Sequence, residues 1–127
     1  MITLKNPALL QTKLFINGKW CDAESQKTFA VINPATGENI AQVANGSATD
    51  TRRAIGAASA AQRIWSQKTA KERSNILRKW FDLVMENQED LAQLLTCEQG
   101  KPLQEARGEI AYGASYIEWF AEEAKRI

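Results

Sequence analysis

Two cysteines are the side chains of this sequence best suited to nucleophilic chemistry. Cys21 and Cys97 lie far apart, and neither has the neighbouring cysteines typical of zinc or redox sites. The chain contains no histidine, which is the commonest general base and metal ligand. Cys97 falls at a predicted helix C-terminus, where the helix dipole does not lower a thiol pKa. We therefore predict no catalytic residue and no metal ligand here.

Glutamates recur at helical spacing near the end of the chain and could in principle form acid–base pairs. The pairs four residues apart are Glu105 with Glu109 and Glu118 with Glu122. Acid–base chemistry needs two environments that separate the two pKa values, whereas carboxylates on a surface helix stay solvated. We predict a solvated face, with ion-pair partners among Lys101, Lys125 and Arg126.

The sequence offers no phosphate-binding loop. Gly100-Lys101 resembles the end of a Walker loop, but Leu95 replaces the required earlier glycine and Pro102 replaces the following Ser or Thr. No G-x-G-x-x-G pattern occurs anywhere in the chain. We therefore predict no cofactor-binding residue within this chain.

Two β-hairpins are predicted after a loose lead-in over residues 1–12. In the first, residues 14–16 and 19–20 flank Asn17-Gly18, a pair that tolerates the positive φ angles of a type I′ turn. In the second, β-prone residues 28–32 and 39–43 flank the turn-forming residues 33–37. Asn45-Gly46-Ser47 then ends the extended region and is interpreted as a plain turn.

Four helices are predicted after the hairpins. The first begins near Ala48–Asp50 with Thr49 or Ser47 as its cap, and the second opens with a capping box formed by Thr69 and Glu72. The third runs from Asn87 to Gly100, where glycine suits a left-handed helix end. The fourth follows Pro102, and its apolar spacing of three and four continues to Ile127.

The apolar faces of these helices contain the expected contact residues. Ala54, Ile55, Ala58, Ala61 and Trp65 belong to the first, and Ile76, Leu77, Trp80, Phe81 and Val84 to the second. Leu91, Leu94 and Leu95 belong to the third, and Leu103, Ala106, Ile110, Ala114, Ile117, Phe120 or Ala121, and Ala124 to the fourth.

Two hairpins followed by four helices indicate an α+β arrangement. Because so little sheet is available to cover the helices, we predict an exposed apolar patch.

Composition limits the classes of partner. Lysine and arginine number 16 against 15 acidic residues, so nothing indicates nucleic acid or an anionic membrane. No apolar run approaches the roughly 20 residues that span a bilayer, and the N-terminus does not have the pattern of a secretory signal. We expect a cytoplasmic protein.

The region around the fourth helix resembles a known enzyme family. Glu98-Gln99-Gly100-Lys101-Pro102, Glu105-Ala106, Gly108-Glu109 and residues 117–123 (IEWFAEE) are similar to the N-terminal part of NAD(P)-dependent aldehyde dehydrogenases, above all the succinate-semialdehyde dehydrogenase branch. The resemblance extends back through Leu14 to Gly18 and covers essentially the whole chain. Members of this family are several times longer than this chain.

The resemblance implies an α/β parent fold, in which this chain is one segment of the cofactor-binding domain. Residues 1–46 would form its lead-in and hairpins, and residues 47–127 a helical layer. In the family, a cysteine thiolate attacks the aldehyde, an oxyanion site holds the adduct, hydride passes to NAD or NADP, and glutamate-activated water releases the acid. No residue with these roles matches a position here, because the family's nucleophile lies downstream of Cys97 in another motif.

Tyr112 and Trp119 are the candidate site residues. The corresponding family helix borders the substrate tunnel, so the resemblance places Tyr112 at the tunnel wall and Trp119 two turns further on. The alternative is that both are core aromatics.

We therefore expect an N-terminal fragment of a succinate-semialdehyde dehydrogenase-like oxidoreductase. It is expected to be inactive alone, to need no cofactor by itself, and to join the remainder of its subunit in a homo-oligomer. One alternative is a non-enzymatic helical module that self-associates or docks on full-length subunits through its exposed apolar faces. A small ligand-binding domain is a second alternative, but it has no convergent polar residues to support it.

Overall fold

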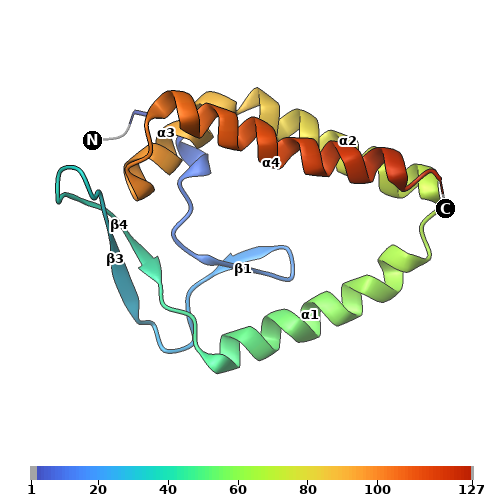
Figure 1. Ribbon diagram of the computed structural model, residues 1–127. Coiled ribbons are helices and arrows are strands. Elements are labelled where there is room, and N and C mark those ends of the chain that lie inside the picture. Colours follow the sequence, from blue (N-terminus) through green and yellow to red (C-terminus); the bar gives the residue numbers. More distant parts are fainter. Residues whose placement is uncertain (1–2, 127) are drawn as a thin grey trace. The chain divides into compact units, whose positions relative to one another are not determined.

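The computed structural model describes residues 3–126 of the chain (Figure 1). Two compact units are formed, one from residues 10–67 and the other from residues 3–9 together with residues 68–126. The elements are a short 3-10 helix Pro7–Leu9, strands β1 Leu14–Ile16, β2 Lys19–Cys21, β3 Thr28–Ile32 and β4 Asn39–Ala44, and helices α1 Ala48–Ser66, α2 Ala70–Glu86, α3 Gln88–Gln99 and α4 Leu103–Glu123. The α+β composition predicted from the sequence is confirmed.

The first hairpin joins β1 to β2 in antiparallel register. Asn17 and Gly18 have φ angles of 52° and 75°, as their turn chemistry predicts. Phe15 pairs with Trp20 across the strands, and their ring centroids lie 4.9 Å apart. This aromatic pair stabilises a hairpin that is otherwise too short to be stable alone.

The second hairpin joins β3 to β4, also antiparallel. Gly37 takes a positive φ of 74° in the connecting turn, and the Asn33 side chain accepts a hydrogen bond from the Ala35 N–H at 2.9 Å. Both predicted hairpins are therefore confirmed.

A reciprocal capping box begins α1 and settles which residue caps it. The Ser47 hydroxyl accepts the Asp50 N–H at 3.4 Å, while the Asp50 carboxylate accepts the Ser47 N–H at 2.9 Å. Asp50 is 3% exposed and also accepts the Glu24 N–H at 3.2 Å. The backbone hydrogen bond from Ser47 is the largest contribution that lowers the Asp50 pKa. One carboxylate thus joins the loop after β2 to the start of α1.

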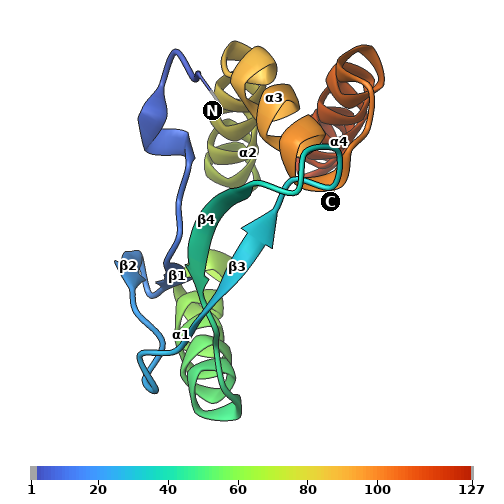
Figure 2. The same cartoon turned by 90° about the vertical axis from the view of Figure 1, so that its left-hand side faces the viewer.

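The other unit is a layer of three helices, in which α4 packs on both α2 and α3 (Figure 2). The predicted capping box of α2 is confirmed, since the Glu72 carboxylate accepts the Thr69 N–H at 2.7 Å. Asn87 stands at the start of α3 as predicted, but its side chain donates to the Leu83 carbonyl and makes no cap. Gly100 ends α3 with a left-handed φ of 80°.

The N-terminal residues are anchored to α3 by a buried carboxylate. Asp90, which is 3% exposed, accepts the Lys5 N–H at 3.0 Å and the Asn6 N–H at 2.7 Å. The loose lead-in predicted for residues 1–12 is therefore tied to the helical unit over its described part up to Leu9. Residues 1 and 2 lie outside the described residues.

Helix α4 ends earlier than its apolar spacing predicts. Its last helical residue is Glu123, and Ala124 and Lys125 form a turn. The Lys125 and Arg126 N–H groups donate to the Glu122 and Glu123 carbonyls. Ile127, to which the predicted helix extended, lies outside the described residues. Four of the five residues from Glu122 to Arg126 are charged, so a further helical turn would have little apolar surface to bury.

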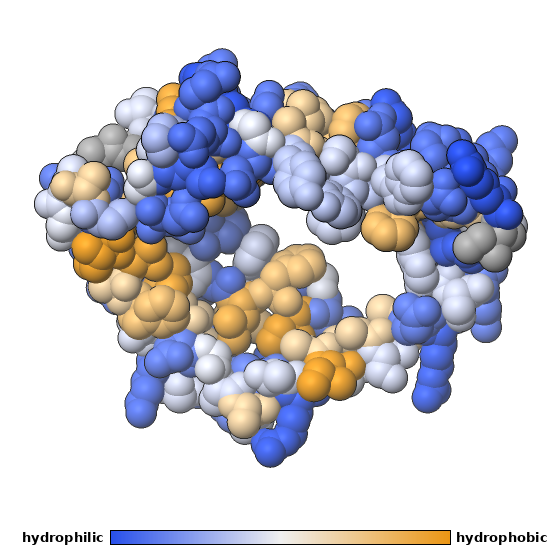
Figure 3. Space-filling view, viewed as in Figure 1, coloured by the Kyte–Doolittle hydropathy of each residue, from blue (hydrophilic) through white to orange (hydrophobic). Residues whose placement is uncertain are grey.

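Most large apolar side chains remain at the surface. Among the described residues, no large side chain is fully buried, and the core consists of Ala23, Ala92, Leu94, Ala106, Ala114 and Ala121. Several residues of the predicted apolar faces are exposed: Ile55, Ala58, Ala61, Ile76, Trp80 and Phe120. Hydrophobic residues also appear at the surface over the strands and α1 on the face shown in Figure 3. The predicted apolar exposure is present in both units.

Contacts group α1 with the strands and not with the other helices. The chain divides near residues 67 and 68, and α1 contacts β1. The predicted boundary between residues 46 and 47 marks the change from strands to helices. The division between the two compact units comes later, because α1 is grouped with the strands. Membership of both units in one cofactor-binding domain stays a prediction.

Candidate functional site

Helix α4 has two faces of opposite character. Ala106, Ala114 and Ala121 lie seven or eight residues apart on one face and are at most 1% exposed, so α4 lies close to its neighbours there. Tyr112 is two residues from Ala114, about 200° around the helix, and lies on the outward side. Small residues thus hold the helix in place while its aromatic residues stay exposed.

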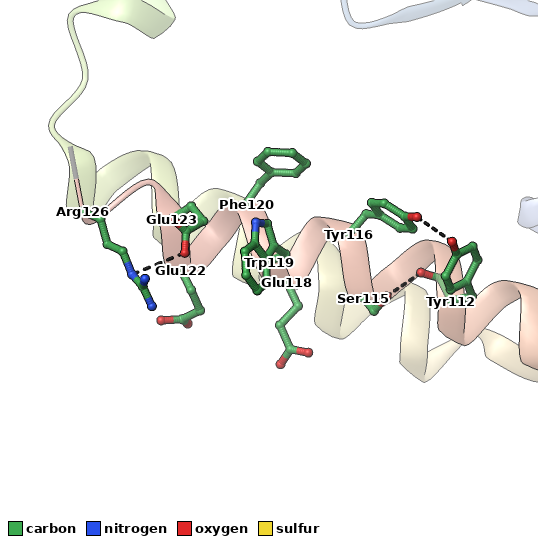
Figure 4. Close-up of a pocket in the computed structure, with 9 residues that line it drawn as sticks. All are labelled: Tyr112, Ser115, Tyr116, Glu118, Trp119, Phe120, Glu122, Glu123 and Arg126. Carbon is green, nitrogen blue, oxygen red and sulfur yellow. Dashed lines mark hydrogen bonds and ion pairs between the residues drawn. The ribbon is translucent and has the colours of Figure 1, made fainter.

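The outward face of α4 contains a row of aromatic side chains. Tyr112, Tyr116 and Trp119 follow one another at spacings of four and three, which places them on one stripe. They are 63%, 51% and 62% exposed. A groove of about 650 Å³ runs along this stripe (Figure 4). The groove is lined by Tyr112, Ser115, Tyr116, Glu118, Trp119, Phe120, Glu122, Glu123 and Arg126.

Two phenols lie at one end of the groove. The hydroxyl oxygens of Tyr112 and Tyr116 lie 2.6 Å apart, and the rings meet edge to face with centroids 5.1 Å apart. The hydrogen bond to Tyr112 raises the pKa of Tyr116, and burial adds to the effect. Figure 4 shows Trp119 and Phe120 further along the helix, where they supply apolar surface.

Ion pairs neutralise the acidic side chains that line the groove. Glu118 accepts a hydrogen bond from Arg78 of α2 at 2.9 Å. Glu122 pairs with Lys125 at 3.1 Å and Glu123 with Arg126 at 3.3 Å. The predicted solvated, ion-paired face is confirmed for these carboxylates, although Arg78 was not among the expected partners.

Neither cysteine lines the groove on α4. Cys21 and Cys97 are both free thiols and half-buried. The Cys21 sulfur lies 3.7 Å from the Arg53 guanidinium, and this contact involves no base. Residues 3–126 contain no group of three or more Cys, Asp or Glu side chains placed to share a metal ion.

Comparison with known proteins gives these features a context. The model of the aldehyde dehydrogenase family matches residues 20–127. The chain belongs to the aldehyde dehydrogenase family. It is 59% identical over 98% of its length to glutarate-semialdehyde dehydrogenase of Pseudomonas putida and 53% identical over 98% to the NADP(+) succinate-semialdehyde dehydrogenase of Escherichia coli strain K12.

Solved aldehyde dehydrogenase structures contain the same fold. Succinate-semialdehyde dehydrogenase from Burkholderia pseudomallei matches 98% of this chain with a TM-score of 0.95 at 58% identity, and the match covers 26% of that chain. The chain likewise spans 26% of the length of the two curated relatives. The resemblance inferred from residues 98–123 is confirmed, and so is its semialdehyde dehydrogenase branch.

Aldehyde dehydrogenases use a dinucleotide, but three of the four helix N-termini described here do not fit its phosphates. Each of the four α-helices carries an acidic residue at its third position, namely Asp50, Glu72, Asp90 and Glu105. The first three carboxylates accept backbone N–H groups, so they already provide the negative charge that a helix N-terminus attracts. The N-termini of α1, α2 and α3 are therefore already supplied with negative charge and do not suit a pyrophosphate.

The structure brings both predicted site residues into one groove. Tyr112 and Trp119 are exposed, so neither is a core aromatic within this chain. Their place in a substrate tunnel stays a prediction. Tyr116 was missed, although its spacing of four from Tyr112 and three from Trp119 puts it on the same stripe.

No α-helix among residues 3–126 has the length and apolar character required to cross a bilayer.

Proposed function

We propose that this chain is the N-terminal segment of a semialdehyde dehydrogenase, which oxidises a short aldehyde bearing a carboxylate. The reaction converts the aldehyde, NAD(P)+ and water into a carboxylate, NAD(P)H and protons. The observation that carries the proposal is the identity of 59% and 53%, over nearly the whole chain, to enzymes named for glutarate and succinate semialdehyde. The family match favours this function over a non-enzymatic helical module.

The proposed contribution of the segment is structural. It is supported by α4, which presents Tyr112, Tyr116 and Trp119 along a groove. This aromatic stripe would form one wall of the substrate tunnel, with its apolar surface against the carbons of the aldehyde. The chemical step would depend on residues outside this sequence.

The proposed partners follow from the same surfaces. The exposed apolar residues of α1, α2 and α4 would be covered by the rest of the dehydrogenase subunit, since the matched relatives are about four times as long. We also propose a homo-oligomeric, cytoplasmic enzyme with NAD or NADP as its cofactor.

Two enzymatic assays test the proposal. In the first, the purified 127-residue chain is mixed with succinate semialdehyde and either NAD+ or NADP+, and absorbance of the reduced cofactor is followed. We expect no turnover. In the second, this chain replaces the matching segment of the Escherichia coli enzyme, and we expect the graft to oxidise succinate semialdehyde.

The outcomes separate the two parts of the proposal. Turnover by the chain alone would overturn the inactivity of the segment. A graft that is folded and binds NADP+ but does not oxidise the aldehyde would overturn its assignment as a semialdehyde dehydrogenase segment. The Escherichia coli enzyme without any replacement is the positive control.

A further inference from the structure

Main-chain groups of β3 point alternately toward β4 and away from it. The Asn45 N–H donates to the Lys27 carbonyl at 2.8 Å, so these two residues at the strand ends form a hydrogen-bonded pair. Hydrogen-bonded and non-hydrogen-bonded pairs alternate along an antiparallel ladder, so Phe29 and Val31 also bond to β4. The main-chain N–H and C=O groups that face away from β4 are therefore those of Thr28 and Ala30.

Ile32 faces outward as well. The register shifts between Val31 and Ile32, because β4 has an extra residue at this point. The Asn33 N–H then donates to the Glu38 carbonyl at 2.9 Å, so Asn33 is the next residue that faces inward. The outer edge of β3 thus presents the main-chain groups of every second residue along the whole strand.

The two outer edges of this sheet differ in their partners. Figure 2 shows β3 and β4 side by side, with each strand forming one edge of the pair. On the β4 edge, the Ala44 N–H donates to the Thr12 carbonyl at 2.8 Å, so the preceding chain occupies part of that edge. Among residues 3–126, no loop main chain or side chain bonds to the outward main-chain groups of β3. An open edge of this kind is a template for another strand.

The β3 edge also lacks the charges that usually protect such a strand. Residues 28–32 have the sequence TFAVI, with no charged side chain and no proline. Phe29 and Ile32 are 51% and 45% exposed. Hydrophobic residues lie at the surface over this hairpin in Figure 3. The edge therefore favours pairing with an apolar strand.

The ends of the extended segment select one register for pairing with an identical strand. Gln26 has a positive φ of 57°, and Pro34 has no N–H, so only residues 27–33 can pair. Ala30 is the midpoint of this segment, so an antiparallel copy places Ala30 opposite Ala30 and Thr28 opposite Ile32. All outward N–H and C=O groups of β3 then have partners in the second copy.

The charges beside the strand are complementary in the same register. Lys27 and Glu38 are exposed, and neither forms an ion pair with another of residues 3–126. Lys27 would face Asn33 of the second copy, and Asn33 is bonded to Glu38 in its own hairpin. Two strand spacings of about 4.8 Å then separate the main chains of Lys27 and the second copy's Glu38, a distance that their side chains can bridge. The two-fold symmetry forms this contact twice.

We propose that the outer edge of β3 pairs with the same edge of a second copy of this chain and forms a four-stranded antiparallel sheet. Phe29 of each copy lies opposite Val31 of the other, in a non-hydrogen-bonded pair where side chains are closest. Thr12 on the β4 edge opposes further addition of strands, so the assembly closes as a dimer. The inference goes beyond the proposed dehydrogenase function, because it involves no substrate and no cofactor.

The size of the interface determines how tight this dimer is. Each copy contributes one strand of five residues, which is far smaller than the interface of a stable dimer. We therefore expect a dissociation constant of about 0.1–1 mM.

Sedimentation equilibrium and amide hydrogen exchange of the 127-residue chain test the pairing. From about 10 μM to about 1 mM, the average mass should rise from monomer toward dimer. Over the same range, the amides of Thr28, Ala30 and Ile32 should exchange more slowly, because they gain partners only in the dimer. The amides of Phe29 and Val31 already bond to β4 and should not change.

Two lysine variants test the register. Ala30→Lys places two ammonium groups opposite each other at the symmetry axis and should weaken the dimer about fivefold. Gln42→Lys is the matched control, since Gln42 is exposed and lies opposite Ala30 on β4. It adds the same charge one strand away from the interface and should leave the dimer almost unchanged.

A charge exchange tests the contact between Lys27 and Glu38. Lys27→Glu and Glu38→Lys should each weaken the dimer about threefold, because like charges then meet. The variant with both changes should dimerise as well as the original chain. Circular dichroism of each variant checks that the fold is retained.

A chain that stays monomeric at about 1 mM would overturn the proposal, and so would added protection in the helical unit instead of β3. Assemblies larger than a dimer would overturn closure, and equal weakening by Ala30→Lys and Gln42→Lys would overturn the register. A double variant as weak as the single ones would overturn the charge contact. These measurements use no substrate, so their failure is distinct from failure of the enzymatic assays above.

Discussion

Arg107 of α4 holds Glu89 of α3 through two parallel hydrogen bonds. Its Nε donates to one carboxylate oxygen at 2.7 Å and its Nη2 to the other at 2.9 Å. The Gln88 side chain adds a bond to the Arg107 carbonyl at 3.0 Å. Only the planar guanidinium offers this fork, so the identity of residue 107 matters more than its charge. The pair joins α3 to α4.

Arg107→Lys should therefore lower the stability of the helical unit although the charge is kept. A lysine supplies one ammonium and cannot engage both oxygens of Glu89 in the same plane. We expect a lower midpoint in urea unfolding with an unchanged slope. Arg52→Lys, at an exposed position of α1, is the control and should leave the midpoint where it is. Equal midpoints for the two variants would contradict the role of the fork.

The same pair predicts a pH dependence. The hydrogen bond from Arg107 is the main cause that lowers the pKa of Glu89 below its usual value of 4.5. A depressed carboxyl pKa contributes stability that is fully present above the unfolded value and is lost as pH falls through the folded value. Urea midpoints measured from neutral pH to below pH 4.5 should fall less steeply for Glu89→Gln than for the unchanged chain. Parallel pH profiles would show that Glu89 does not contribute.

The buried face of α4 predicts a contrast between two neighbouring positions. Ala114 is 1% exposed, so Ala114→Leu should overpack the buried face of α4 and cost about 1–3 kcal/mol. At Gly113, a Cβ would meet nothing within 4 Å, so Gly113→Ala should stabilise the helix by about 0.5–1 kcal/mol. Thermal unfolding measures whether Ala114→Leu lowers and Gly113→Ala raises the stability. Stabilisation by Ala114→Leu would contradict the close packing of this face.

The start of α1 offers a test between two candidate caps. The Ser47 hydroxyl accepts the Asp50 N–H, so Ser47→Ala should destabilise the strand unit by about 1 kcal/mol. Thr49 is exposed inside the first turn, and Thr49→Ala should stay within about 0.5 kcal/mol of the original stability. Chemical denaturation followed by tryptophan fluorescence measures both. A larger loss of stability with Thr49→Ala than with Ser47→Ala would show that Thr49, and not Ser47, caps α1.

Local chemistry made much of this fold predictable. Asn17-Gly18 specifies its turn through two positive φ angles, and Thr69 with Glu72 specifies a helix start through bonds three residues apart. Such interactions involve neighbours in the chain, so the sequence displays them directly. The family resemblance supplied the rest of the functional expectation and could not come from these local patterns.

Long-range contacts account for what was missed. Asp90 looks like an ordinary first-turn acid, and only the folded chain brings it to the Lys5 and Asn6 N–H groups. Arg78 reaches Glu118 across two helices in the same way. The early end of α4 was missed because apolar spacing alone does not mark where packing partners stop.

The tunnel-wall assignment of α4 is tested most directly by steady-state kinetics of the graft described above. Trp119→Ala and Tyr112→Ala should each raise KM for succinate semialdehyde roughly tenfold with a smaller change in kcat, because they remove surface that binds the substrate. Trp80→Ala, an exposed tryptophan of α2 outside the groove, should leave KM unchanged. Unchanged KM in the α4 variants, or an equal rise with Trp80→Ala, would contradict the account.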